Sequence, residues 1–145
     1  MYQLPTLPYL FQDLEPYIDT HTMGLHYHKH EQNYLNQLNA LLQKNHYDYR
    51  YSLGELLYHI NEFPIEDQED IRYNLGGVLN HNLYWKSMNP KQGQKPMGAL
   101  KNHLEATFGS YDQFWNVLKE HAMKLKGSGY TFLVLKNNGV LDVIN

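Results

Sequence analysis

The sequence predicts an α+β fold, in which an antiparallel helical hairpin comes first and an α/β segment with an antiparallel sheet follows. Three observations lead to this prediction. Apolar residues recur at helical spacing through most of the chain. The pattern then changes to two short β runs near the end. Between the two parts, residues 89–97 contain two prolines and a glycine, which marks a linker and a candidate domain boundary.

An extended arm and a first long helix are expected at the start of a domain that covers residues 1–90. Three prolines interrupt residues 1–18, so this arm is expected to lie extended on the domain. Asp19 or Thr20 can then cap a helix that runs to about Gln43, because apolar residues recur along it at helical intervals.

A shorter helix and a second long helix complete the hairpin. Ser52 and Glu55 have the spacing of a capping box, in which each side chain accepts from a backbone N–H of the other residue. The short helix that follows is expected to end near Pro64. The second long helix is expected over residues 66–88, with Gly76 and Gly77 in its middle. These glycines cost about 1–2 kcal/mol together relative to alanine, so either something approaches the backbone closely there or the helix bends.

The second domain is expected to begin at residue 97 and to extend through residue 145. It opens with a helix near residues 99–108 and continues with one that follows Ser110 and ends near Gly127. Two β runs come next, joined by a two-residue turn at Asn138-Gly139. A hairpin of two strands is marginal in water and leaves an outer edge unpaired, so we expect the sheet to be incomplete, with a third strand missing.

Composition narrows the classes of function. The chain has no cysteine, which excludes disulfides, zinc–thiolate sites and iron–sulfur clusters within it. The formal net charge of −3 offers no attraction to nucleic acid or to an anionic membrane. No signal peptide or membrane span is recognisable, so the cytoplasm is the expected compartment. A small anionic substrate would need a local positive centre, such as a metal ion.

Histidines and aromatic residues recur at helical spacing in both long helices. His26, His30 and Tyr34 fall at i, i+4 and i+8, so a helix presents them on one face over about 12 Å. His81 and Trp85 repeat this spacing on the other helix. An inward-facing histidine on each of two packed helices is a common way for a bundle to bind a metal, and imidazole suits Mn, Fe, Zn, Cu or Ni.

Spacing alone also permits a purely structural interpretation, in which the aromatic residues fill a core and the histidines are solvated. Five further histidines are expected at the surface or at helix ends, namely His21, His28, His46, His59 and His103.

Four motifs follow one another along the chain and cover it nearly end to end: Leu4–Tyr9 with Leu14–Pro16, Thr22–His30 and Tyr34; Asn80–Trp85; Phe108–Phe114; and Gly127–Tyr130. In sequence and in order they resemble the motifs of the iron/manganese superoxide dismutases. This family resemblance implies the same two-part fold, a manganese or iron ion, a homodimer, and the reaction 2 O₂⁻ + 2 H⁺ → O₂ + H₂O₂.

The resemblance implies roles for individual residues. His26 and His81 resemble two of the metal ligands. Tyr34 resembles the tyrosine that gates the substrate channel, and His30 resembles the histidine beside it.

An aromatic wall and a glycine complete the implied surroundings of the metal. Trp85 and Tyr84 resemble residues that keep the site dry, whereas Tyr130 and Phe132 stand where the family has tryptophans. Gly77 resembles the manganese-type pattern, because iron-type members often place a glutamine on this helix.

The family's other two ligands, an Asp and a His, lie in a D-x-W-x-H motif after the hairpin. Residues 1–145 contain no such motif. The run Glu120-His121-Ala122 imitates part of it but precedes the hairpin and lacks the Asp and Trp. We therefore expect an incomplete metal site. Three explanations remain open: a fragment of a longer enzyme, a truncated and catalytically incompetent scaffold or interaction protein, or a half that is completed by a partner chain.

Overall fold

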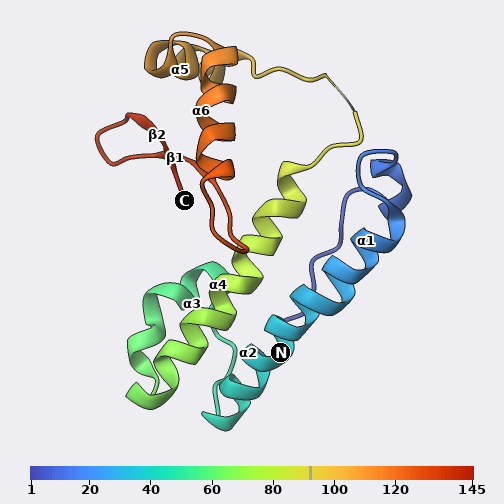
Figure 1. Ribbon diagram of the computed structural model, residues 1–145. Coiled ribbons are helices and arrows are strands. Elements are labelled where there is room, and N and C mark those ends of the chain that lie inside the picture. Colours follow the sequence, from blue (N-terminus) through green and yellow to red (C-terminus); the bar gives the residue numbers. More distant parts are fainter. Residues whose placement is uncertain (92) are drawn as a thin grey trace. The chain divides into compact units, whose positions relative to one another are not determined.

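The computed structural model describes residues 1–91 and 93–145. The chain divides into two compact units, one of residues 1–92 and one of residues 93–145. The first unit is helical, whereas the second combines two helices with a β-hairpin (Figure 1). This agrees with the α+β class that the sequence predicts.

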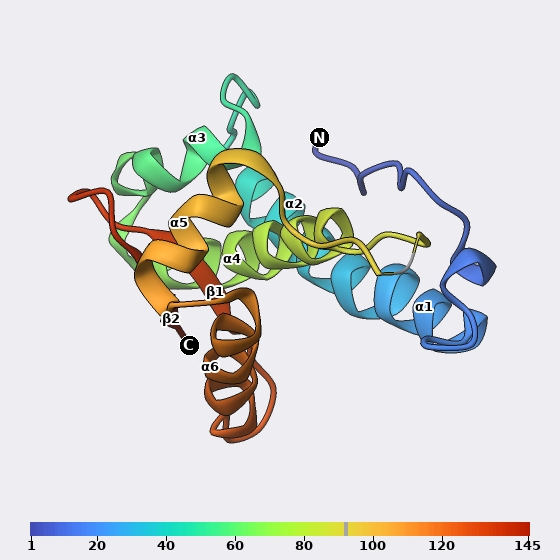
Figure 2. The same ribbon diagram turned by 90° about the horizontal axis from the view of Figure 1, so that it is seen from above.

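The first unit is built on two long antiparallel helical arms, the first over residues 20–44 and the second over residues 65–87. α2 and α4 lie side by side along most of their lengths (Figures 1 and 2). In chain order the elements are the 3₁₀ turn η1 (Phe11–Leu14), α1 (Thr20–Leu25), the π-helical segment η2 (His26–Glu31), α2 (Gln32–Lys44), α3 (Leu53–Leu56), the 3₁₀ segment η3 (Leu57–Glu62) and α4 (Ile65–Ser87).

Capping residues fix where these helices begin. The Asp19 side chain accepts from the Thr22 backbone N–H at the start of α1. Ser52 and Glu55 form the predicted reciprocal capping box at the start of α3. These interactions satisfy N–H groups that the first turn of a helix leaves without partners.

The first arm is helical throughout, as predicted, but it is not a regular α-helix. Within η2 the helical hydrogen bonds span five residues instead of four, and the Gln32 N–H reaches the Tyr27 carbonyl five residues back. A π segment of this kind inserts one extra residue into a turn and is often found at functional sites. The sequence gives no sign of it, because an i, i+4 pattern of histidines is what a regular α-helix predicts.

Apolar side chains from both arms form the main core of the first unit. Along α2, Leu38 and Leu42 are completely buried. Across from them α4 contributes Ile71, Leu75 and Val78, which are equally inaccessible. This core fixes the spacing of the two arms and hence of any side chains that face each other farther along them.

A buried carboxylate ties the end of one arm to the start of the other. Asp67, near the start of α4, accepts from Lys44 Nζ at 2.7 Å and from Asn45 Nδ2 at 2.9 Å. The hydrogen bond from Lys44, followed by the one from Asn45, lowers the pKa of Asp67. The two arms are therefore joined by a polar clasp at this end of the hairpin.

The Asp67 clasp predicts a specific acid sensitivity. Because the folded-state pKa lies below the ordinary value of about 3.9, these bonds stabilise the protein at higher pH and are lost as the pH falls through the folded-state pKa. Asp67→Asn should thus lower stability at pH 7 and flatten its fall below about pH 4. Urea unfolding at several pH values measures this, with the exposed Glu69→Gln as control; a slope unchanged by Asp67→Asn would contradict it.

The second unit packs two helices against a hairpin. α5 spans Gly98–Phe108 and α6 spans Tyr111–Met123, and β1 (Phe132–Leu135) pairs antiparallel with β2 (Leu141–Ile144). Ser110 caps α6 by accepting from the Gln113 N–H. The buried members of its core are Leu104, Phe114, Leu141 and Val143. Among the described residues the sheet has these two strands.

The hairpin turn corrects one expectation. The sequence predicts a two-residue turn at Asn138-Gly139, but the chain turns through three residues, Asn137 to Gly139. The Lys136 N–H donates to the Val140 carbonyl, and the Lys136 carbonyl accepts from the Gly139 N–H. Gly139 has φ +80°, while Asn138 does not take a positive φ. A type I turn followed by a left-handed glycine explains this geometry, whereas the two-residue turn favoured by Asn-Gly needs positive φ at both residues.

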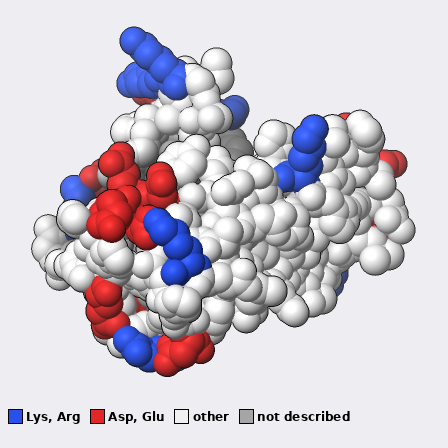
Figure 3. All heavy atoms as spheres, turned by 90° about the horizontal axis from the view of Figure 1, so that it is seen from below, with Lys and Arg blue, Asp and Glu red and all other residues white. Residues whose placement is uncertain are grey.

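Charged side chains of both signs are interspersed on the face shown in Figure 3, and much of its described surface carries neither. Within the described residues, no helix combines the length and the apolar character that crossing a membrane requires.

Candidate metal centre

Two histidines from different arms meet inside the first unit. The ring centroids of His26, at the start of η2, and His81, on α4, lie 4.8 Å apart, with the ring planes at 81°. His81 is buried, and His26 is partly buried. The proximity expected from the sequence is therefore present, and the packing of α2 on α4 produces it.

A backbone carbonyl fixes the tautomer of His81. Its Nδ1 lies 2.7 Å from the carbonyl oxygen of Gly77, one turn earlier on α4. A carbonyl oxygen can only accept, so Nδ1 carries the proton and Nε2 carries the lone pair of the neutral ring. This is the arrangement in which a second contact sets the orientation of a metal-binding histidine.

Burial favours the neutral form of both imidazoles. It lowers the pKa of His26, and the nearby His81 and His30 lower it further. Burial also lowers the pKa of His81, against the opposing effect of the bond to Gly77. Neutral imidazole is the form that binds metal ions, so the electrostatics of the site suit a cation.

Trp85 and Tyr84 form an aromatic wall beside these histidines. The Trp85 ring lies 4.9 Å from that of His26 and is almost completely buried. The Tyr84 ring lies 5.4 Å from His26. The predicted wall is thus contributed by the same helix that carries His81.

Tyr34 approaches the site from α2 and rests on a glycine. Its ring centroid lies 5.6 Å from that of His81. A Cβ atom built on Gly77 would lie 2.5 Å from carbons of the Tyr34 ring, whereas one built on Gly76 meets nothing within 4 Å. Of the two mid-helix glycines, Gly77 is therefore the one that a close approach requires.

A groove between the arms leads to Tyr34. Its volume is about 730 Å³, and its lining includes Tyr34, His30 and Tyr73. The Tyr73 ring lies 5.7 Å from that of Tyr34, and the interaction with the Tyr73 side chain, followed by burial, raises the pKa of Tyr34. His30 is exposed in this groove, and its ring lies 6.0 Å from that of His26.

Sequence reasoning missed a buried carboxyl next to this site. Glu31 is fully buried, and its Oε2 accepts from the Trp85 indole N–H at 2.6 Å. Burial raises the pKa of Glu31, against the opposing effect of the indole bond. Its spacing from the buried Leu35, Leu38 and Leu42 would have indicated a carboxyl on the apolar face of the helix. Sequence reasoning also missed Tyr73, and no spacing pattern indicates that it lies near the site.

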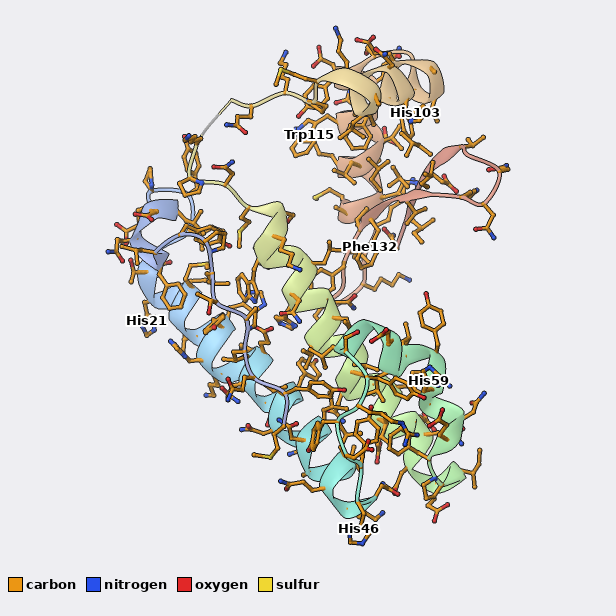
Figure 4. The ribbon with its side chains drawn as sticks, turned by 180° about the vertical axis from the view of Figure 1, so that it is seen from behind. His21, His46, His59, His103, Trp115 and Phe132 are labelled. Atoms are coloured by element: carbon orange, nitrogen blue, oxygen red, sulfur yellow. The ribbon has the colours of Figure 1, made fainter. Side chains whose placement is uncertain are left out.

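Other predicted residues lie elsewhere. Tyr130 and Phe132 belong to the second unit, where their rings lie 6.0 Å apart, and their role in the wall stays a prediction. Figure 4 shows His21 on the outer side of α1 and His46 beyond the end of α2. His59 stacks on Tyr51 with ring centroids 3.8 Å apart.

The residues present fit part of a metal site. No group of three or more His, Cys, Asp or Glu side chains that could hold a metal occurs in residues 1–91 and 93–145. Two neutral imidazoles nevertheless converge, and one of them is oriented by a carbonyl. Imidazole donors fit manganese and iron as well as Zn, Cu and Ni, so the two rings do not select the metal by themselves.

Comparison with known proteins places both units in one family. Residues 1–89 match the family described as iron/manganese superoxide dismutases, alpha-hairpin domain, and residues 96–145 match the C-terminal domain of the same enzymes. The chain is 38% identical over 144 residues to a superoxide dismutase [Mn] of Yersinia enterocolitica, covering 99% of this chain and 69% of that protein.

Two further relatives agree. A superoxide dismutase [Mn] of Thermus aquaticus is 38% identical, covering 99% of this chain and 71% of that protein. A superoxide dismutase [Mn/Fe] 2 of Staphylococcus aureus is 36% identical, covering 99% of this chain and 70% of that protein. With both units matched and the identity sustained over nearly the whole chain, this protein belongs to the iron/manganese superoxide dismutase family.

Proposed function

We propose that the protein is a superoxide dismutase, which converts superoxide to dioxygen and hydrogen peroxide with a manganese or iron ion. The observation that supports this most directly is the meeting of His26 and His81, with His81 oriented by the Gly77 carbonyl. His26 and His81 would hold the ion. When bound, the ion supplies a one-electron couple between its +3 and +2 states.

The surrounding residues have separate tasks in this proposal. Trp85 and Tyr84 exclude water from one side of the imidazoles. Tyr34 stands at the end of the groove next to His81, where its hydroxyl can hold a proton for the peroxide product. His30 lies in the same groove and helps to define the entrance for a small anion.

Manganese is the favoured metal. Iron-type members often carry a glutamine at the position of Gly77, and here any side chain at that position would meet the Tyr34 ring. The names of the Yersinia and Thermus relatives also specify manganese.

The function is tested by measuring the metal content of the purified protein together with superoxide consumption. We expect manganese or iron to copurify and superoxide to disappear faster than with the free ion. Absence of both would contradict the proposal. A cytoplasmic location and a homodimer remain predictions; light scattering after size exclusion tests the dimer and would also reveal a completing partner chain.

Tyr34→Phe should separate proton supply from metal binding. The substitution keeps the ring on Gly77 and removes only the hydroxyl, so metal content should be unchanged. Turnover should fall by at least several-fold and by no more than about 10⁴-fold, the upper end of acid–base contributions. Metal analysis and stopped-flow kinetics measure the two effects. Tyr58→Phe, at an exposed position, is the matched control. Loss of metal in Tyr34→Phe would show that the tyrosine has a different role.

A further inference from the structure

The buried carboxyl of Glu31 is not explained by packing. Leu35, Leu38 and Leu42 continue the same buried face of the helix, so an apolar side chain would suit this position. Glu31 is instead fully buried, and its Oε1 has no hydrogen-bond partner among residues 1–91 and 93–145. A buried polar group with an unsatisfied atom destabilises the folded state, so the carboxyl needs a reason other than filling space.

The other oxygen of this carboxyl makes a single strong contact. Oε2 accepts from the Trp85 indole N–H at 2.6 Å, and Trp85 is itself almost completely buried. The indole also contacts the His26 ring, with 4.9 Å between ring centroids. One indole is thus in contact with both the carboxyl and the imidazole.

The π-helical segment makes this arrangement possible. His26 opens η2 and Glu31 closes it, five residues later. In a regular α-helix two residues five apart are rotated by about 140° around the axis, so one indole could not easily reach both. With i→i+5 hydrogen bonds, the two residues lie about one turn apart and face the same neighbour.

We propose that Glu31 is a positioning residue, whose carboxyl holds the Trp85 indole against His26 and thereby sets the direction of the His26 ring. Its importance for metal binding rests on the proposed function. The positioning itself concerns three side chains of this chain and is present without a metal.

The test uses metal-free protein that carries Trp115→Phe, because the sequence has two tryptophans and Trp85 is then the only one. Glu31→Gln keeps an oxygen acceptor and removes the carboxyl. Glu31→Leu removes the acceptor at similar volume. The exposed Glu69→Leu is the control. Nuclear magnetic resonance reports the indole N–H of Trp85 and the ring protons of His26, which lie within range of the indole ring current.

In the parent protein we expect the indole proton to exchange slowly with solvent. Glu31→Gln should preserve the slow exchange and the His26 signals. Glu31→Leu should accelerate exchange at least tenfold and shift the His26 signals. Adding Trp85→Phe should abolish any further effect of Glu31→Leu on His26, because Glu31 acts through Trp85.

Three results would overturn the proposal. They are fast indole exchange in the parent protein, equal disturbance by Gln and Leu, and an effect of Glu31→Leu on His26 that persists without Trp85. The first decides the matter even where the leucine variant fails to fold. Manganese titration is a separate measurement, in which Glu31→Leu should weaken binding about tenfold. A parent protein that binds neither manganese nor iron but keeps the expected resonances would contradict the proposed function and leave the positioning role supported.

Discussion

Alanine at Gly77 is expected to leave the protein less stable than alanine at the adjacent Gly76, by about 1–3 kcal/mol. Both substitutions gain about 1 kcal/mol of helix propensity, so this term cancels between the two variants. The two positions differ in the room for a methyl group, because a Cβ at Gly77 would lie 2.5 Å from the Tyr34 ring and one at Gly76 meets nothing within 4 Å. The contacted ring carbons are near the base of the side chain, so Tyr34 must turn away as a whole.

Urea unfolding of the two variants side by side measures this difference. Gly76→Ala should be as stable as the parent protein or more so, whereas Gly77→Ala should be the less stable of the pair and should lose turnover because Tyr34 is displaced from the groove. Equal stabilities would show that Tyr34 does not depend on a bare backbone at Gly77.

Removing the imidazole of His81 should weaken manganese or iron binding by at least about 100-fold. Mutating residues that only hydrogen-bond to metal ligands already lowers metal affinity by about 10–100-fold, and loss of a ligand removes a direct bond to the metal. Superoxide consumption should fall to the level of the free ion. Metal analysis and kinetics on His81→Ala measure both effects, and His26→Ala should behave alike.

The control for His81→Ala is His46→Ala, because His46 is exposed beyond the end of α2 (Figure 4). Far-UV circular dichroism confirms that each variant is folded. An unchanged metal content in His81→Ala would contradict the assignment of this histidine as a ligand, and an equal loss in His46→Ala would show that the effect is nonspecific.

Much of the fold could be predicted because its signals are local. Ser52 and Ser110 indicate helix starts because their side chains cap the first turn, and the β runs are indicated by their residue types. The hairpin turn was predicted wrongly, because Asn-Gly is equally compatible with the last two residues of a longer loop. The choice between a two-residue turn and a three-residue loop depends on the register in which the strands pair, which local sequence patterns do not determine.

The candidate site was predictable only in part. Helical spacing placed His26 and Tyr34 on one face, and family resemblance paired them with His81. The contacts of Gly77 with Tyr34 and of Glu31 with Trp85 join residues that are far apart in the chain. Such contacts depend on how the arms pack and on the extra residue in η2, which no local pattern reveals.

The extra residue in η2 also has a consequence for insertions and deletions. The wider turn absorbs this residue, so that α1, whose Met23 belongs to a core with Trp85, stays in phase with α2, whose leucines belong to the core with Ile71. Deleting one residue, such as the exposed Lys29, would let the segment return to a regular α-helix, in which His26 and Glu31 are four residues apart and still share one face. Both cores could then still be filled, so this short segment can lose one residue without disturbing the packing on either side of it.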